Sequence, residues 1–132
     1  MTQEESIKLL ALIKLAYPNS YKDIDKDTQI ATVNMWRRAF IDTPFCIVEM
    51  ALDSFVRESK FPPTIADITE RLQSIHDEAT LNFLSTGDGQ RREAYRYIMN
   101  ATERYIGRNE NIIHPNMIEN LLKGDGQLLL GS

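Results

Sequence analysis

Residues 42–68, DTPFCIVEMALDSFVRESKFPPTIADI, contain two helix signals separated by a double-proline corner. Thr43-Pro44 is typical of a helix start, because a hydroxyl can cap free amides and proline is favoured at the first helical position. Apolar residues then recur at spacings of three and four, which predicts one buried helical face. The residues of this face are Phe45, Val48, Leu52 and Phe55.

The corner itself has a clear chemistry. Phe61-Pro62-Pro63 ends the first helix, because the residue before a proline is disfavoured in the helical conformation. Thr64-x-x-Asp67 follows at once and is close to a capping box, with aspartate in the place of glutamate. We therefore expect the corner to fix the angle between two core helices.

Helical patterns on both sides of the corner extend the bundle. Thr2-x-x-Glu5 is a capping box that opens a helix to about Ala16, whose apolar residues predict burial on more than one side. A second helix is expected at about residues 26–41, and a fourth follows the corner. The fold class is therefore all-α, with residues 1–84 as a compact N-terminal four-helix bundle. The expected core contains Trp36, Phe45, Val48, Leu52, Phe55, Ile68 and Leu72.

Residues 85–132 differ in character. Residues 85–90 have the composition of a linker, and a fifth helix is expected at about residues 91–106. Its apolar face is thin, so this helix needs a packing partner or remains marginal. Beyond it we expect a flexible C-terminal tail, in which Gly124-Asp125-Gly126 separates two apolar clusters.

Composition limits the cellular setting and the partners. The net charge of −4 makes direct DNA binding or attraction to an anionic membrane unexpected. A single cysteine, Cys46, cannot form an internal disulfide, which fits a reducing, cytoplasmic setting. No signal-peptide pattern and no apolar run of membrane-spanning length are present, so no membrane association is expected.

One acidic motif invites a metal hypothesis. Asp23-x-Asp25-x-Asp27 looks like the opening of a calcium loop. Position six of such a loop would be Thr28 instead of glycine, and position twelve would be Asn34 instead of glutamate. Both departures remove what calcium requires, so a solvated acidic loop is the preferred interpretation.

Other cofactor and catalytic patterns are missing from the sequence. No glycine-rich loop ends in Gly-Lys-Ser or Gly-Lys-Thr, the pattern of a phosphate-binding loop. His76 and His114 have no histidine or cysteine partner at ligand spacing, and His76 is expected to be solvated. The sequence therefore predicts no metal, no cofactor, no catalytic residue and no enzyme activity.

Arginines gather in the middle of the chain. Residues 1–83 carry nine Lys and Arg against thirteen Asp and Glu, whereas residues 84–108 carry five against three. Three interpretations stay open: phosphate contacts with neighbouring tyrosines stacking on bases, a solvated helix, or a second surface for an acidic protein partner. The arginines are Arg91, Arg92, Arg96, Arg104 and Arg108.

The tail carries too many large apolar residues to be exposed at no cost. They either fold back on the bundle or form an amphipathic element that docks into a groove of a partner, which we favour. These residues are Met117, Ile118, Leu121, Leu122, Leu128, Leu129 and Leu130.

Four motifs together resemble the bacteriophage replicative helicase loader/inhibitor family. They are Thr2-Gln3-Glu4-Glu5, Tyr17-Pro18-Asn19-Ser20-Tyr21, Asn34-Met35-Trp36 and Phe61-Pro62-Pro63-Thr64-Ile65-Ala66-Asp67-Ile68. The likeness covers about the first 68 residues. It implies an α-helical N-terminal domain, a flexible C-terminal region and a non-enzymatic role in phage DNA replication, in the cytoplasm of an infected bacterial host cell.

The resemblance also implies partners. Members of that family bind the hexameric replicative helicase in its ATP-bound form, restrain it, and help to load it at the origin through the origin-binding initiator. Their C-terminal region binds the helicase, and by location we assign that role here to the seven apolar tail residues. Two alternatives remain: a DNA-binding replication or transcription module using the basic fifth helix, and a homo-oligomeric adaptor.

Overall fold

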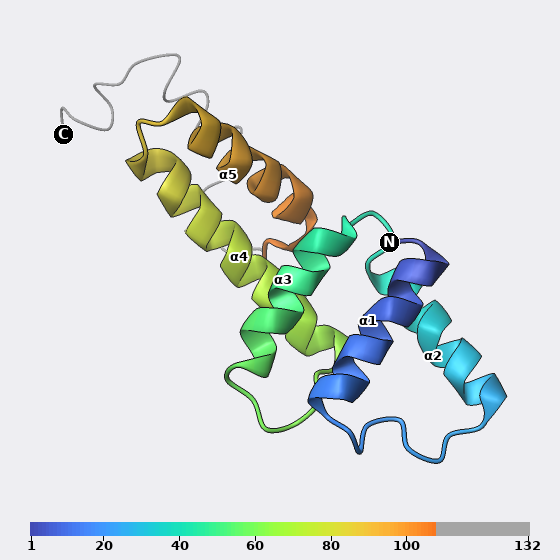
Figure 1. The fold of residues 1–132 in the computed structure, drawn as a ribbon. Helices are drawn as coiled ribbons and strands as arrows, with labels where there is room; N and C mark the ends of the chain where they lie inside the picture. The colour runs from blue at the N-terminus through green and yellow to red at the C-terminus, as the bar shows by residue number, and fades with distance from the viewer. Residues whose placement is uncertain (108–132) are drawn as a thin grey trace. The chain divides into compact units, whose positions relative to one another are not determined.

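The computed structural model describes residues 1–107 and builds them almost entirely from helices (Figure 1). The helices are α1 (Gln3–Ala16), α2 (Lys26–Ala39), α3 (Phe45–Val56), α4 (Ile65–Ser85), α5 (Gly89–Thr102) and the short 3-10 helix η1 (Glu103–Tyr105). No strand occurs in this part of the chain, which confirms the all-α class.

The chain packs as two compact units, Met1–Leu72 and Gln73–Ser132, and the second is described as far as residue 107. The boundary lies inside α4, so this helix contributes its first two turns to the first unit and the remainder to the second. The domain boundary expected near residue 84 stays a prediction, because a packing unit and an independently folding domain are different properties.

The first unit has a core of large apolar side chains. Six of the seven expected core residues are buried, and the seventh, Phe45, is half-buried with the Lys8 ammonium 5.3 Å from its ring centroid. The buried apolar side chains of α1 to α3 and the start of α4 are Leu9, Ile13, Trp36, Ile47, Val48, Ala51, Leu52, Phe55, Ile68 and Leu72. The helical spacing in residues 42–68 therefore identified the core face of α3 correctly.

The capping box after the double proline is present. The Asp67 amide donates to Thr64 Oγ1 at 3.1 Å, and the Thr64 amide donates to Asp67 Oδ2 at 2.9 Å. The corresponding pair at Thr2 and Glu5 opens α1 in the same way. Each box satisfies amides that a helix start otherwise leaves to solvent.

The start of α3 differs from the prediction. Pro44 is the N-cap residue and makes no side-chain cap hydrogen bond, so the capping role expected for Thr43 is wrong. Thr43 is instead buried in the turn after α2, where its carbonyl oxygen accepts from the Met1 amino group at 3.1 Å. The same amino group also donates to the carbonyl oxygens of Phe40 at 3.0 Å and Ile41 at 2.9 Å, where the α2 dipole favours positive charge.

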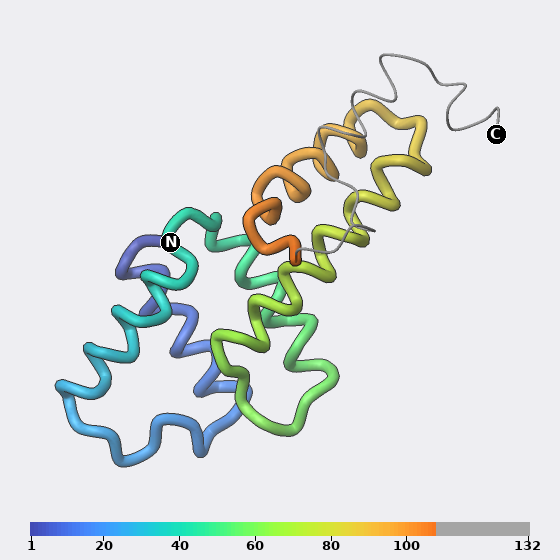
Figure 2. The backbone as a smooth tube through the Cα atoms, turned by 180° about the vertical axis from the view of Figure 1, so that it is seen from behind, coloured from blue at the N-terminus to red at the C-terminus, as the bar shows by residue number. Residues whose placement is uncertain are grey.

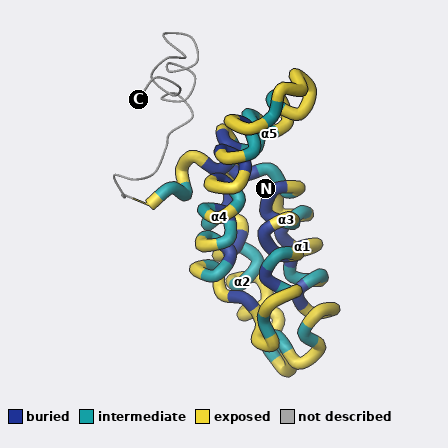
Figure 3. The backbone as a smooth tube through the Cα atoms, turned by 90° about the vertical axis from the view of Figure 1, so that its left-hand side faces the viewer, coloured by how far each residue is buried: buried dark blue, intermediate teal, exposed yellow. Residues whose placement is uncertain are grey.

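Helix α1 is buried on one side only (Figure 3). It packs against α2 and α3 through Leu9 and Ile13, with Ser6 beside them. Ile7 and Leu15 remain 51% and 78% exposed, so the expectation of burial on more than one side is wrong. An apolar surface on α1 is thus left without a covering element in the first unit.

The second unit is a helical hairpin. Helix α5 runs back along the C-terminal part of α4 after a turn of only three residues, 86–88 (Figure 2). The Asp88 carboxylate caps α5 by accepting from the amides of Gln90 at 2.9 Å and Arg91 at 3.4 Å. The helix therefore begins at Gly89, two residues before its expected start, and the linker is a capped turn.

His76 lies inside this hairpin and is fully buried, so the prediction of a solvated side chain is wrong. Its Nδ1 lies 3.1 Å from the Met99 carbonyl oxygen and 3.1 Å from Thr102 Oγ1. A carbonyl oxygen only accepts, so Nδ1 carries the proton and donates to it. The polar neighbours Asp77 and Glu78 suggested exposure, but they lie on the other face of α4.

Candidate functional site

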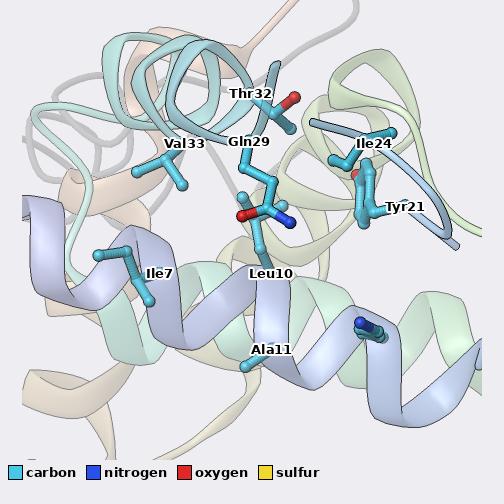
Figure 4. A pocket seen from close by; sticks show the side chains of 9 residues that line it. Ile7, Leu10, Ala11, Tyr21, Ile24, Gln29, Thr32 and Val33 are labelled. Atoms are coloured by element: carbon cyan, nitrogen blue, oxygen red, sulfur yellow. The ribbon is translucent and has the colours of Figure 1, made fainter. Parts of the chain in front are cut away.

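An open, mostly apolar hollow of about 290 Å³ lies between α1, α2 and the loop that joins them (Figure 4). We call it the α1/α2 hollow. It is lined by Ile7, Leu10, Ala11, Lys14, Tyr21, Ile24, Gln29, Thr32 and Val33. All of these residues belong to the first unit.

Helical spacing explains why these side chains share one hollow. The α1 residues stand at positions 7, 10, 11 and 14, and the α2 residues at 29, 32 and 33, so each set occupies one helix face. The joining loop adds Tyr21 and Ile24 as a third wall. The two helices are in contact through their buried residues, and the hollow lies beside that contact.

The loop wall has an unusual backbone. Tyr21 and Asp23 both adopt positive φ angles, 57° and 62°, a region that costs an ordinary residue about 1–3 kcal/mol. Trp36 stabilises the arrangement, because its indole N–H donates to the Tyr21 hydroxyl. Burial raises the pKa of Tyr21, and the hydrogen bond from Trp36 opposes that shift. The wall is therefore preformed, and its phenol remains neutral at physiological pH.

The acidic motif in the same loop serves the fold. Asp25 is the N-cap of α2, and its Oδ1 accepts from the Thr28 amide at 2.8 Å. Hydrogen bonds from the Thr28 side chain and amide lower the pKa of Asp25. Within residues 1–107 no three His, Cys, Asp or Glu side chains are grouped so as to hold a metal ion.

A second, more polar hollow of about 450 Å³ adjoins the end of α1. It is lined by Ala16, Tyr17, Pro18, Asn19, Ser20, Lys60 and Pro62. Two motifs far apart in sequence, the loop after α1 and the double-proline corner, thus meet at one surface. The Tyr17 hydroxyl fastens them by donating to the Ser59 carbonyl oxygen at 2.8 Å.

The arginine cluster is partly used in packing. The guanidinium carbons of Arg92 and Arg96 lie 4.4 and 5.6 Å from the centroid of the buried Phe83 ring. Arg96 also pairs with Glu93 at 2.9 Å, and Arg91 approaches Asp88 at 4.0 Å. These arginines therefore cover and cap their own hairpin before they meet any partner.

The remaining members of the predicted sites lie elsewhere. Arg104 is in η1, with its guanidinium carbon 5.4 Å from the Tyr105 ring centroid. Arg108 and the seven apolar tail residues, Met117, Ile118, Leu121, Leu122, Leu128, Leu129 and Leu130, lie outside the described residues.

Sequence reasoning missed the α1/α2 hollow, although a signal for it existed. An α1 pattern that is apolar almost all round contains more apolar surface than one packed face can bury. The surplus, seen at Ile7 and Leu10, marks either a second packing partner in the fold or a surface left for another molecule. Which of the two applies depends on the loop path, which periodicity does not encode.

One comparison with known proteins gives a match. The family model for the N-terminal domain of the phage gene 39 protein, a helicase loader/inhibitor, matches residues 1–69, just over half of the chain. No curated protein and no solved structure gives a significant match. Among the helices of residues 1–107, none combines the length and apolarity needed to cross a bilayer.

Proposed function

Because this chain belongs to the gene 39 protein family of phage helicase loaders and inhibitors, we propose that it binds the ATP-bound hexameric replicative helicase. It restrains the helicase and delivers it to the origin through the origin-binding initiator, in the cytoplasm of the infected bacterial cell. The family match over residues 1–69 supports this proposal, because it includes every motif on which the resemblance rests. The family comprises non-enzymatic replication accessory proteins.

The nucleotide requirement follows from the partner. The sequence contains no phosphate-binding loop, so the dependence on ATP has to come from the helicase. A loader of this kind acts by binding one helicase conformation more tightly than the other, because a ligand shifts an equilibrium only through differential affinity. Restraint and loading are then two consequences of the same preference.

We assign helicase binding to the apolar tail residues. They are Met117, Ile118, Leu121, Leu122, Leu128, Leu129 and Leu130. Neither of their two clusters is long enough to form a stable helix alone in water, so burial on another protein would supply the missing stabilisation. The ordering cost lowers affinity and favours release, which a loader requires because a clamped helicase cannot unwind DNA.

The arginines of α5 are proposed as a second partner surface, without direct contact to DNA. Two of them, Arg92 and Arg96, already stack on Phe83, which supports a structural share in their role. Arg91 is the most solvent-exposed member with a described ion pair, at 73% side-chain exposure. Phosphate contacts would compete with these existing partners, whereas an acidic protein surface can approach the exposed edge.

Removal of residues 115–132 tests the tail assignment. The shortened protein should keep its helical circular dichroism and melting temperature, and lose both helicase binding and helicase inhibition. Replacement of Leu121, Leu122, Leu128 and Leu129 by serine should have the same effect without shortening the chain. Binding is measured by pull-down of the phage helicase with ATP, with ADP and without nucleotide.

A matched control uses an exposed leucine of the first unit. Leu15 is 78% exposed, so Leu15→Ser removes an equally accessible apolar side chain outside the tail and should leave helicase binding unchanged. Full inhibition by the shortened protein would contradict the tail assignment and place the helicase site on the two helical units.

A further inference from the structure

The α1/α2 hollow has features of a docking site that the proposed tail contact does not use. Its walls are mostly aliphatic, and Ile7 at one end is 51% exposed. Leu15, which follows the lining residue Lys14, is 78% exposed and extends the apolar surface along α1. Contiguous exposed apolar surface beside a hollow is typical of sites that bind another molecule.

The size of the hollow selects the kind of ligand. Its accessible space of about 290 Å³ lies at the lower edge of the roughly 300–1,000 Å³ that enclose drug-sized ligands. The hollow is also open on one side, so a small molecule would leave much of its surface in water. A few aliphatic side chains projecting from a protein segment fit such a space better than a cofactor does.

The polar lining adds a charge requirement. The Thr32 hydroxyl already donates to the Thr28 carbonyl oxygen at 2.7 Å, which leaves Lys14 and Gln29 as the polar side chains able to select a ligand. Within residues 1–107 the Lys14 ammonium forms no ion pair. An ammonium beside a partly dry apolar surface is complementary to a carboxylate of the bound segment.

The wall formed by the loop is prepared before binding. Tyr21 and Asp23 retain their strained φ angles, and Trp36 holds the Tyr21 side chain by a hydrogen bond. A preformed wall lowers the ordering cost of association, because fewer rotamers and loop conformations are lost on binding. Strain kept in a loop that lines an open apolar hollow fits a binding role better than a purely structural one.

We propose that the α1/α2 hollow docks an amphipathic helix of a partner protein, which places two apolar side chains one turn apart in the hollow and a carboxylate on Lys14. The assignment of the partner rests on the proposed function. The helicase is assigned to the tail, so the hollow is the surface that holds the origin-binding initiator. Two separate surfaces allow one loader molecule to contact both proteins at once.

The test uses the full-length protein and the purified initiator of the same phage. Ala11→Phe fills the hollow, and Lys14→Glu reverses its charge; both residues are exposed, so neither change touches the core. Ala66→Phe and Lys60→Glu make the same chemical changes at exposed positions outside this hollow. Initiator affinity should fall by at least about tenfold in the first two variants, about 1.4 kcal/mol, and by less than about twofold in the controls.

Helicase inhibition in the same five proteins separates the two proposals. It should be equal throughout, because the tail is intact in all of them. Failure of the unsubstituted protein to bind the helicase would contradict the proposed function, whatever the hollow variants do. Normal helicase binding together with unchanged initiator affinity in Ala11→Phe and Lys14→Glu would contradict the docking site alone.

Two other occupants would also overturn the proposal. If the hollow holds a second copy of the chain, sedimentation will show an oligomer that Ala11→Phe dissociates. If it holds the chain's own tail, removal of residues 115–132 will shift the methyl NMR signals of Ile7, Leu10 and Val33 before any partner is added. A monomer whose hollow signals move only on addition of the initiator supports the proposal.

Discussion

The first unit, Met1–Leu72, and the described part of the second, residues 73–107, are stabilised by different kinds of contact. The first unit buries large apolar side chains from four helices and fixes two helix starts with capping boxes. The hairpin of the second unit has a cluster of only Ala79, Phe83 and Met99 as its buried apolar core. Polar and cationic side chains supply much of the rest.

The hairpin uses these side chains in specific ways. His76 connects α4 to α5 through hydrogen bonds to Met99 and Thr102, and a buried polar group of this kind stabilises only while its partners remain in place. Arg92 and Arg96 stack on Phe83, which keeps the ring out of water while the charges stay near the surface. The hairpin therefore depends on a few residues, whereas the first unit distributes its stability over many.

The largest expected effect follows from Phe83. Phe83→Ala should cost about 3–5 kcal/mol, because the ring is fully buried and its loss also removes the surface on which Arg92 and Arg96 stack. Amide hydrogen exchange should then accelerate throughout α5, while α3 keeps its protection. Equal acceleration in α3 and α5 would mean that the two units unfold as one block, and the contrast between them would disappear.

Leu52 gives the corresponding change in the first unit. Leu52→Ala leaves a cavity beside the α3 core and should destabilise by about 2–5 kcal/mol. The melting temperature of the first unit, followed by the fluorescence of the buried Trp36, should fall accordingly. A negligible change would show that the core tolerates the cavity and that stability in this unit is distributed even more widely than its packing indicates.

The same contrast explains what could be predicted from sequence. The core face of α3, the corner at Pro62-Pro63 and the capping box at Thr64 depend on residues within one or two turns of each other, so local patterns were sufficient to find them. The buried His76 depends on Met99 and Thr102, which lie 23 and 26 residues away, and its polar neighbours gave the opposite indication.

The candidate site was harder to predict than the fold. The α1/α2 hollow exists because the loop after α1 places Tyr21 and Ile24 beside both helices, and the positive φ angle of Tyr21 belongs to no local motif of the sequence. The arginines of α5 were visible in the sequence, but their stacking on Phe83 depends on the hairpin turn. Spacing identifies which residues share a helix face, and the path of the chain decides what that face meets.

The smallest expected effect concerns the ion pair that joins α3 to the start of α4. The Arg71 guanidinium lies 2.7 Å from a Glu58 carboxylate oxygen, 3.3 Å from Ser54 Oγ and 5.8 Å from the Phe55 ring centroid. The hydrogen bond and charge of Arg71 hold the pKa of Glu58 below its usual value. Arg71 is thus positioned by packing, which gives this exposed pair a better geometry than most surface pairs.

The direction of the pH dependence follows from that shift. A carboxyl whose pKa is lower in the folded state contributes stability that is fully present above its unfolded pKa, about 4.3, and is lost as pH falls through the folded value. Urea unfolding should therefore show the unsubstituted protein slightly more stable than Glu58→Gln at pH 7, with the difference vanishing in the acid range. Glu78→Gln changes an exposed second-unit residue without an ion pair within residues 1–107, so it should show no such difference. A constant Glu58→Gln deficit down to the lowest pH would mean that the side chain acts through packing, and the corner would then rely on apolar contacts and capping boxes alone.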